Sequence, residues 1–257
     1  MKTEPLQGAD MTDTDNAIDP DPTELREQLV AANHILVRQG VLDAFGHVSA
    51  RTAAGADTFL LSRNLAPGSV TADDLLVHDL DGRASGDRPL YLERFIHAEI
   101  YRRRPDVMAV VHSHSPSVIP FSLCATPLRP VIHMAGFLAS ERTPVYEISD
   151  YAGDASDLLI TSAGLGASLA ITLAGDSVAL MRGHGSVTAG SSLRESVYRA
   201  VYTEVNARIQ LEAHSLGNPR YLSAGEAKSA DETVGGQADR AWNVWRDQVT
   251  QERNQSK

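Results

Sequence analysis

Residues 106–114 read DVMAVVHSH, an apolar run that ends in two histidines one residue apart. The run has the length and the valine content of a buried strand, and residues 115–117 look like the start of a helix. On an extended backbone His112 and His114 leave from the same face, so their imidazoles can converge on one point. The sequence therefore predicts a strand that presents two histidines at its end.

Two histidines in this arrangement suggest a metal site, but the spacing alone is weak evidence. Neutral imidazole suits Zn, Mn, Fe, Cu or Ni, and two imidazoles by themselves hold such an ion poorly. The rest of the chain would have to supply more ligands. An isolated pair of this kind is equally typical of polar loop residues at the end of a strand.

Length and composition favour one domain with tails. The chain has 257 residues, 42% of them apolar, which suffices for a substantial core. No run of eighteen apolar residues occurs, and residues 1–21 are acidic and polar, so we expect no signal peptide, no membrane span and a cytoplasmic location. The only cysteine, Cys124, excludes an intrachain disulfide framework and gives no support to a thiolate metal cluster.

The net charge of −10 argues against nucleic acid as a partner, because binding to phosphates needs a basic face. The one basic cluster, residues 102–104, falls at the end of a predicted helix. Cations are favourable there because they complement the helix dipole. A solvated helix end is therefore the simpler explanation of this cluster.

We divide the chain into three parts. Residues 1–20 are rich in Asp, Thr and Gly and are predicted to be a disordered tail. A helix that begins at Asp21 opens the main domain, which we place at residues 21–225. Residues 226–257 are expected to be a C-terminal tail with a short helix around residues 242–245, whose two tryptophans would pack or make subunit contacts.

The first predicted strand, residues 45–51, alternates polar and apolar side chains. His47, Ser49 and Arg51 should therefore share one face of it. Such a row is either a solvent-facing surface or the wall of a polar site, and taken alone the pattern favours solvent. Further strands at residues 58–62 and 75–80 are joined by short turns, which suggests antiparallel pairing.

A helix is predicted from Glu93 to Arg103, stopped by Pro105. Glu93 and His97 lie four residues apart and share a helix face, although one such pair is usually just a surface contact. Beyond the histidine pair, a short helix should run toward Cys124, and a proline-marked loop follows it.

The second half of the chain contains another apolar strand that ends in a histidine. We expect a strand at residues 144–148, a glycine-broken helix at residues 155–173 and a long helix at residues 192–216. Between these helices, residues 177–185 form an apolar strand that ends in His184. Its flanking glycines, Gly183 and Gly185, let the backbone come close to a ligand.

Taken together, these motifs resemble the class II aldolase/adducin family over residues 22–225. The shared parts, in the family's order, are a Gly-x-Val-Ser-x-Arg strand at residues 46–51, Glu93 opening a helix ahead of Arg-Pro-Asp at residues 104–106, Val-Val-His-x-His, and a later His-Gly. The resemblance implies an α/β fold, a three-layer α/β/α sandwich around a mostly antiparallel central sheet.

The resemblance also implies the ligand set. His112, His114 and His184 become metal ligands, and Glu93 becomes a fourth ligand that can leave the metal to act as an acid or base. Such a set suits a divalent ion with an open position for substrate, with manganese, zinc and other transition metals all used in the family.

Departures from the sugar-phosphate aldolases bear on the substrate. L-fuculose-1-phosphate aldolase has Asn where His47 stands, a Thr-Pro-x-Gly turn near residues 62–64, and a Ser-Ser pair where this chain has Tyr91-Leu92. Groups that cradle a phosphate are therefore largely missing, which favours a carboxylate substrate. Residues 91–97 and 112–122 look most like the decarboxylase branch, which acts on 3-hydroxy-2-methylpyridine-4,5-dicarboxylate or on hydroxylated phthalates.

The resulting hypothesis is a metal-dependent lyase that decarboxylates a hydroxylated aromatic carboxylate in a catabolic pathway. Glu93 would be the acid, with His133 or Tyr91 as helpers, and Arg51 would clamp a second carboxylate. The motif match also places Arg182 near the site. The complete predicted substrate-binding set is His47, Ser49, Arg51, Ser62 and Arg63.

Two other hypotheses stay open. A retro-aldol lyase or epimerase on a small sugar acid or sugar phosphate would share the metal and Glu93. An adducin-like binding protein would keep the fold without catalysis, although it would have no need for three histidines and a glutamate at these positions. Family members usually assemble as tetramers with sites at subunit interfaces, so a homo-oligomer is expected.

Overall fold

The computed structural model describes residues 22–84 and 86–255. The predicted disordered tail, residues 1–20, and the predicted helix cap at Asp21 lie outside the described residues. The first helix, α1 (Pro22–Arg38), follows the expected apolar stripe. Its side chains Leu25, Leu29 and Leu36 are buried against the sheet, as an amphipathic surface helix requires.

A seven-stranded sheet forms the centre of the molecule, in the order β3-β2-β1-β4-β7-β6-β5. All neighbours pair antiparallel except β5 and β6, which pair parallel. The expectation of a mostly antiparallel sheet is thus confirmed. The strands are β1 (His47–Arg51), β2 (Thr58–Ser62), β3 (Leu75–Asp79), β4 (Ala109–Ser113), β5 (Val145–Tyr146), β6 (Val178–Met181) and β7 (Gly185–Gly190).

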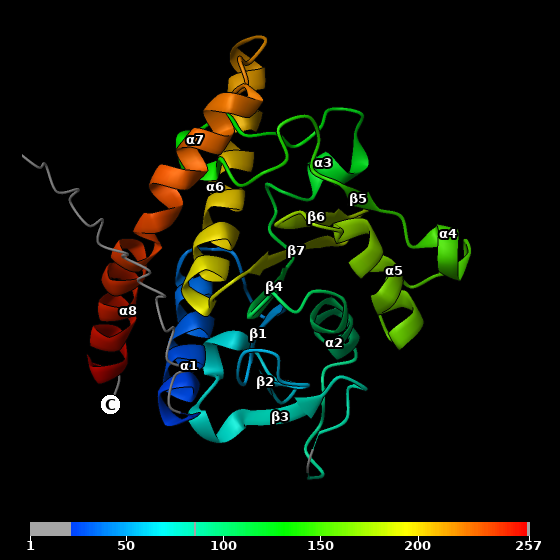
Figure 1. Cartoon of the computed structure of the whole chain (residues 1–257), viewed down its shortest axis with the longest axis vertical. Coiled ribbons are helices and arrows are strands. Elements are labelled where there is room, and N and C mark those ends of the chain that lie inside the picture. The colour runs from blue at the N-terminus through cyan, green and yellow to red at the C-terminus, as the bar shows by residue number, and fades with distance from the viewer. Residues whose placement is uncertain (1–21, 85, 256–257) are drawn as a thin grey trace, which may run out of the picture.

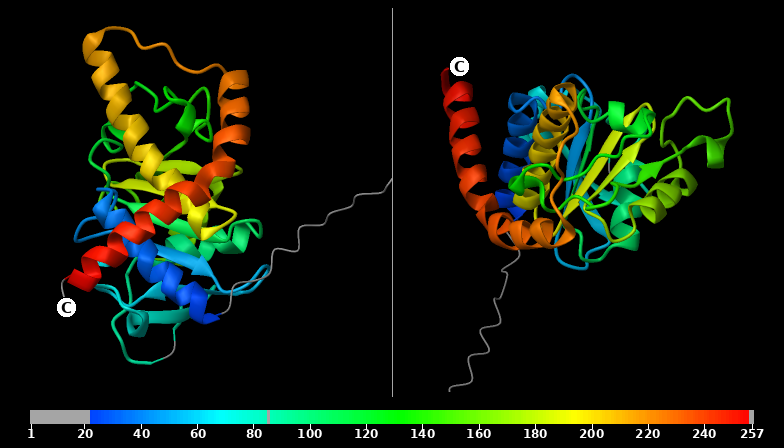
Figure 2. Two further views of the ribbon diagram at one scale, coloured as in Figure 1. Left: turned by 90° about the vertical axis from the view of Figure 1, so that its left-hand side faces the viewer. Right: turned by 90° about the horizontal axis from the view of Figure 1, so that it is seen from above.

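Helices cover both faces of this sheet (Figures 1 and 2). One face carries α1 and α6 (Leu193–Leu216), on which α8 (Ala238–Gln255) packs from outside, and the other carries α2 (Arg94–Arg103) and α5 (Ala163–Leu173). The predicted three-layer α/β/α sandwich is confirmed. The remaining α-helices of the described chain are α3 (Pro120–Leu123), α4 (Ser149–Ala152) and α7 (Ala224–Val234).

Strand β4 lies in the middle of the sheet and is buried along its whole length. Val111 belongs to the apolar cluster under α1 and α6, whereas its neighbour Val110 belongs to the cluster under α2 and α5. A strand covered on both faces needs apolar side chains on both, which explains the continuous run in the sequence. Because side chains alternate, His112 points to the same side as Val110, toward α2 and α5.

The solvent-face interpretation of β1 was wrong. His47, Ser49 and Arg51 do share one face, but all three are buried. That face lies under α2, so helix packing rather than water covers it. The polar side chains are tolerated there because each finds hydrogen-bond partners inside the protein.

Two further expectations need correction, and one strand was missed. The helix expected at residues 155–173 begins only at Ala163, after Ser162 caps it by accepting from the amide of Leu165. Strand β7 was not anticipated. The short helix expected around residues 242–245 is instead the 18-residue α8, whose Trp242 is fully buried in the cluster shared with α1.

The predicted division of the chain into three parts stays a prediction. Within the described ranges, no helix combines the length and apolar character needed to cross a membrane.

Candidate metal centre

Four side chains from different elements meet at one end of the sheet. Glu93 immediately precedes α2, His112 lies in β4, His114 follows that strand by one residue, and His184 sits in the tight turn between β6 and β7. Each offers one ligand atom, and these four atoms lie within 4.8 Å of one another. The structure thus brings together the whole predicted ligand set.

The distances within this cluster are short and even. The Nε2 atom of His114 lies 3.0 Å from that of His112 and 3.1 Å from that of His184. The Oε2 atom of Glu93 lies 3.5 Å from the Nε2 atoms of both His112 and His184. Ligands bound at about 2.1 Å to one ion are separated by about 3.0–3.4 Å, so the spacing matches a single metal shell.

Backbone groups orient these ligands. The Nδ1 atom of His112 is 3.2 Å from the carbonyl oxygen of Ser186, and that of His184 is 2.9 Å from the carbonyl oxygen of Leu158. A carbonyl only accepts, so both rings carry their hydrogen on Nδ1 and aim an Nε2 lone pair at the centre. The amide of Ile160 donates to Oε1 of Glu93 at 2.9 Å, which leaves Oε2 for the cluster.

The donor set therefore fits a divalent cation. Imidazole lone pairs and a carboxylate that converge on one point repel one another unless a positive charge lies between them. Second ring nitrogens that donate to carbonyl groups are the usual support for histidine ligands. Three histidines and a carboxylate suit zinc, manganese or another transition metal, and the arrangement does not choose among them.

The electrostatics of the cluster also favour a cation. Burial raises the pKa of Glu93, but the neighbouring His112 and His184 lower it by more, so its pKa lies well below the usual range. Burial, together with the same neighbours, lowers the pKa of His114 to about 4. At neutral pH the cluster therefore offers an anionic carboxylate and a neutral His114.

The glycines on either side of His184 have distinct tasks. Gly183 adopts a φ of +66°, a backbone conformation that side chains disfavour. Gly185 lies so close to β4 that a Cβ atom there would overlap the carbonyl oxygen of Ser113. Close approach of β7 to β4 thus sets the position of His184. The expected close approach of this backbone to a ligand stays a prediction.

The predicted substrate-binding residue His47 lies beside the cluster. Its backbone pairs with His112 across β1 and β4, and the two ring centres are 5.0 Å apart. The ring of Tyr91 packs on its other side at 4.5 Å. Ser49, two residues along β1, bonds instead to His97 and Tyr101 of α2, so it reaches the cluster only through other side chains.

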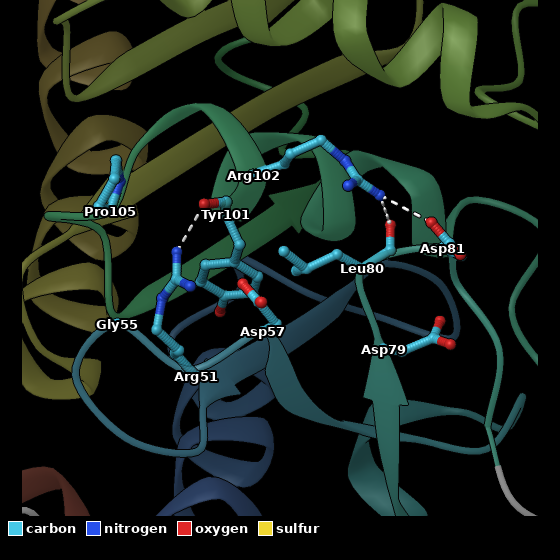
Figure 3. A pocket seen from close by; sticks show the side chains of 9 residues that line it. All are labelled: Arg51, Gly55, Asp57, Asp79, Leu80, Asp81, Tyr101, Arg102 and Pro105. Carbon is cyan, nitrogen blue, oxygen red and sulfur yellow. Dashed lines mark hydrogen bonds and ion pairs between the residues drawn. The ribbon is translucent and has the colours of Figure 1, made fainter.

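Arg51 is not brought to the cluster. It lies four residues from His47, about 13 Å along the strand, and its guanidinium donates to backbone carbonyls. Figure 3 shows it in a separate surface pocket, where it donates to the carbonyl oxygen of Tyr101. Its other acceptors are the carbonyl oxygens of Ala56, Arg104 and Val107. A buried guanidinium needs such partners, and they leave it no free edge for a substrate carboxylate.

The remaining predicted contacts lie on the β2 side of the site. Ser62 lies 3.3 Å from the hydroxyl of Tyr91, and that hydroxyl donates to the carbonyl oxygen of Leu65 at 2.5 Å. Arg63 forms an ion pair with Asp74 at 2.7 Å. These groups hold one another in place, and Tyr91 faces His47 with its ring rather than with its hydroxyl.

His133 and Arg182 lie elsewhere. His133 is exposed in a short 3-10 helix (His133–Ala135) that packs against α7 and α6, so one chain does not bring it to the cluster. Arg182 is two residues before His184 but forms an ion pair with Glu147. The hydrogen bonds from this arginine and from Ser149 hold the pKa of Glu147 down at about 2, although its slight burial opposes them.

Several functional groups escaped the sequence reasoning. The carbonyls of Leu158 and Ser186 and the amide of Ile160 belong to the backbone, and no residue type signals such a role. The sequence predicts a surface pair of His97 with Glu93, yet His97 is fully buried and bonds to His47 and Ser49. The available signal for its role was a polar residue on the side of α2 that faces β1.

Residues 27–211 match the family described as Class II Aldolase and Adducin N-terminal domain. This chain belongs to that family. It is 38% identical over 241 residues to decarboxylase tropJ of Talaromyces stipitatus. The aligned region covers 84% of this chain and 90% of that protein.

Two other members of the family are also similar to this chain. The 3,4-dihydroxyphthalate decarboxylase of Arthrobacter keyseri is 29% identical over 208 residues, covering 75% of this chain and 79% of that one. Among solved structures, an aldolase II superfamily protein from Pseudomonas syringae superposes with a TM-score of 0.74 at 26% identity, covering 92% and 96% of the two chains. These similarities support both the fold and a carboxy-lyase class.

Proposed function

We propose that this class II aldolase family member is a metal-dependent decarboxylase of an aromatic carboxylate with a hydroxyl group next to the carboxylate. The observation that carries the proposal is the convergence of His112, His114, His184 and Glu93 on one point, with their orientation fixed by backbone groups. The decarboxylase relatives, one of them named for 3,4-dihydroxyphthalate, support the substrate class.

The surroundings of the cluster suit a flat apolar ring. Phe45, Leu92 and Leu123 expose 68%, 59% and 58% of their surfaces. Phe45 has its ring centre 6.4 Å from that of His114, Leu92 adjoins Glu93, and Leu123 packs beside Gly183 in the turn that carries His184. We infer that these exposed apolar side chains, each near a ligand or its neighbour in sequence, border the substrate ring.

A bound divalent ion would supply Lewis-acid chemistry, drawing electrons from the hydroxyl and carboxylate oxygens. Glu93, a carboxylate at neutral pH, takes the proton of the substrate hydroxyl. It then returns that proton to the ring carbon as the bond from this carbon to the carboxylate breaks and CO₂ leaves. The phenolate oxygen regains a proton from water, so the overall reaction consumes one proton per CO₂.

The ring of Tyr91 supports His47 in this scheme, and its hydroxyl stays on Leu65. His133 has no role within one chain. We also propose a homo-oligomer, with a tetramer as the expected form, and a place in the breakdown of aromatic compounds. Light scattering of the metal-loaded protein measures the oligomeric state.

The test is CO₂ release from a panel of hydroxylated benzene and pyridine carboxylates, with aldehyde release from sugar phosphates measured in parallel. Protein loaded with zinc and with manganese should release CO₂ from at least one aromatic acid. Glu93→Gln should lower kcat by about 10²–10⁴. Glu99→Gln is the control and should keep its activity, because Glu99 is a buried glutamate of α2 that pairs with Arg102.

The alternative function, a retro-aldol lyase or epimerase on a sugar acid or sugar phosphate, uses the same metal ligands. It needs free phosphate-binding groups, whereas Arg51 and Arg63 are engaged with partners of their own chain. Aldehyde release from sugar phosphates without CO₂ release from any aromatic acid would reject the decarboxylase.

A further inference from the structure

A line of buried polar groups runs from α2 to the edge of the metal cluster. The hydroxyl of Tyr101 lies 2.8 Å from Oγ of Ser49, which in turn lies 2.6 Å from Nδ1 of His97. On the other side of that ring, Nε2 of His97 lies 2.6 Å from Nδ1 of His47. All four side chains are buried, with at most 3% of their surface exposed. The line is a continuous hydrogen-bonded relay.

The relay ends beside the metal ligands. His47 packs against the ring of His112, and its Nδ1 is taken by His97. Its Nε2, across the ring from Nδ1, bonds to no described residue. A fully buried nitrogen without a partner would belong to the small set of such atoms in the described chain, and Nε2 of His47 does not. This nitrogen therefore reaches accessible space. This nitrogen is therefore the group through which the relay meets a ligand.

Counting hydrogens leaves two directions for the relay. Both histidines are neutral, because they are buried and no carboxylate bonds to either ring. Each neutral ring carries one hydrogen, as does each hydroxyl. Three contacts then take three of the four hydrogens, and the fourth is left at one end: on Nε2 of His47, or on the hydroxyl of Tyr101.

The buried Tyr101 end of the relay decides between these two directions. Tyr101 is 1% exposed, and its hydroxyl has two hydrogen-bond partners, Oγ of Ser49 and the backbone of Val110. The Val110 amide can only donate, so among the described residues Ser49 is the acceptor available to the hydroxyl hydrogen. If its hydrogen pointed elsewhere, it would be a buried donor without an acceptor, which costs about 1–3 kcal/mol. Tyr101 therefore donates to Ser49, Ser49 donates to Nδ1 of His97, and Nε2 of His97 donates to Nδ1 of His47.

We propose that Tyr101, Ser49 and His97 are positioning residues that fix His47 in the tautomer with hydrogen on Nε2, and that His47 donates this hydrogen to an anionic oxygen of the substrate. The identity of that oxygen, a carboxylate or phenolate oxygen of an aromatic acid, rests on the proposed function. The direction of the hydrogen bonds in the relay does not rest on the proposed function, because it follows from the buried groups alone.

A fixed donor makes the site selective for an anion. Nε2 of His47 offers a hydrogen bond without carrying a charge that would repel a bound cation. A hydrogen bond to an anionic oxygen is about twice as strong as one between neutral groups. It also opposes a ligand that presents another donor at this point, because two donors would face each other.

The first experiment reads the tautomer directly and needs no substrate. Full-length protein with ¹⁵N-labelled histidine, loaded with zinc, is studied by two-bond ¹H–¹⁵N correlation NMR, and His47→Gln assigns the signals of His47. The expected result is a protonated Nε2 and an unprotonated Nδ1 in His47. A protonated Nδ1 in His47 would overturn the proposal.

Two variants test the cause of the tautomer. His97→Phe removes the donor to His47, so both nitrogens of His47 should move to intermediate shifts as the two tautomers exchange. His78→Phe removes a different buried histidine, stacked on Phe59 at 5.2 Å and outside the relay, and should leave the His47 signals unchanged. His47 signals that do not respond to His97→Phe would show that the relay does not set the tautomer.

The second experiment measures binding of 2-hydroxybenzoate by calorimetry. His47→Met, which has no donor, should weaken binding by about tenfold or more, whereas His47→Gln keeps an N–H and should restore part of the affinity. Equal affinity in the wild type and both variants would overturn the donor role of His47. If the tautomer and the binding pattern hold but no aromatic acid is decarboxylated, only the proposed function fails.

Discussion

In the proposed metal centre, one backbone hydrogen bond holds each of three candidate ligands. The carbonyls of Ser186 and Leu158 fix the rings of His112 and His184, and the amide of Ile160 fixes the carboxylate of Glu93. Metal affinity at such sites depends on these outer partners as well as on the ligands. Substitution of a single candidate ligand therefore tests metal binding most directly.

Replacing His184 with alanine should lower metal affinity by at least about 100-fold, because the donor set loses one of its three imidazoles. Metal content after dialysis, measured by mass spectrometry, gives the answer. His214→Ala, at an exposed histidine in the last turn of α6, is the control and should keep its metal. Equal metal content in the two variants would exclude His184 as a ligand.

His78 makes stability depend on pH. It is fully buried, its Nε2 has no partner in the described chain, and burial lowers its pKa to about 4. The unfolded chain, with an ordinary pKa near 6.5, binds this proton more readily than the folded protein. Stability from this group is therefore complete above pH 6.5 and is lost as the pH falls toward 4.

His78→Phe should remove that dependence. Between pH 7.5 and pH 4.5 the variant should lose about 2 kcal/mol less unfolding free energy than the wild type, as measured by urea titration. The comparison uses the metal-free form of both proteins, so loss of metal in acid does not contribute. Parallel pH profiles for the two proteins would contradict the assignment.

At the scale of elements, the hairpin of β6 and β7 decides where His184 stands. Gly185→Ala should place a methyl group against the carbonyl oxygen of Ser113 and push β7 away from β4. We expect a loss of about 1–3 kcal/mol in unfolding free energy, together with weaker metal binding. Gly175→Ala is the matched control, because a Cβ there meets nothing within 4 Å.

The loop before α5 shows why an element boundary matters for the site. Residues 155–162 were expected to be part of the helix that ends at Leu173, but Leu158 adopts a φ of +68°, and its carbonyl accepts from His184. A leucine in this backbone region costs free energy and persists only where surrounding contacts hold it. The chain stays non-helical there because its backbone supports the ligands.

At the scale of the whole molecule, α8 completes the core on the face of the sheet away from α2 and α5. Trp242 is 1% exposed and belongs to the same apolar cluster as α1 and α6. Trp242→Ala should cost about 3–5 kcal/mol of unfolding free energy, measured by denaturant titration.

Two comparisons accompany that measurement. Val244→Ala, at an exposed position of the same helix, should change stability by less than about 0.5 kcal/mol. Metal content should be unchanged in folded Trp242→Ala, because the cluster lies on the other side of the sheet. Loss of metal from the folded variant would mean that the two faces are coupled.

The sequence by itself predicted the candidate ligands and the layers, through motifs that resemble those of the class II aldolase/adducin family. His112-x-His114, Glu93 and the glycine-flanked His184 are local patterns, each at the end of an apolar strand or the start of a helix, and such patterns survive into the fold. The continuous apolar run of β4 likewise predicted a buried strand, and the structure covers that strand on both faces. In these cases the cause lies within a few neighbouring residues.

Tertiary structure decided the rest, because the cause lay in segments far apart in the sequence. Whether His47, Ser49 and Arg51 face water depends on α2, which lies some fifty residues later. In the same packing, the guanidinium of Arg51 donates to backbone carbonyls. His97, which the sequence suggests is a surface residue, instead links Ser49 to His47. A polar side chain on a strand has no fixed role until the fold decides whether water or another buried group will be its partner.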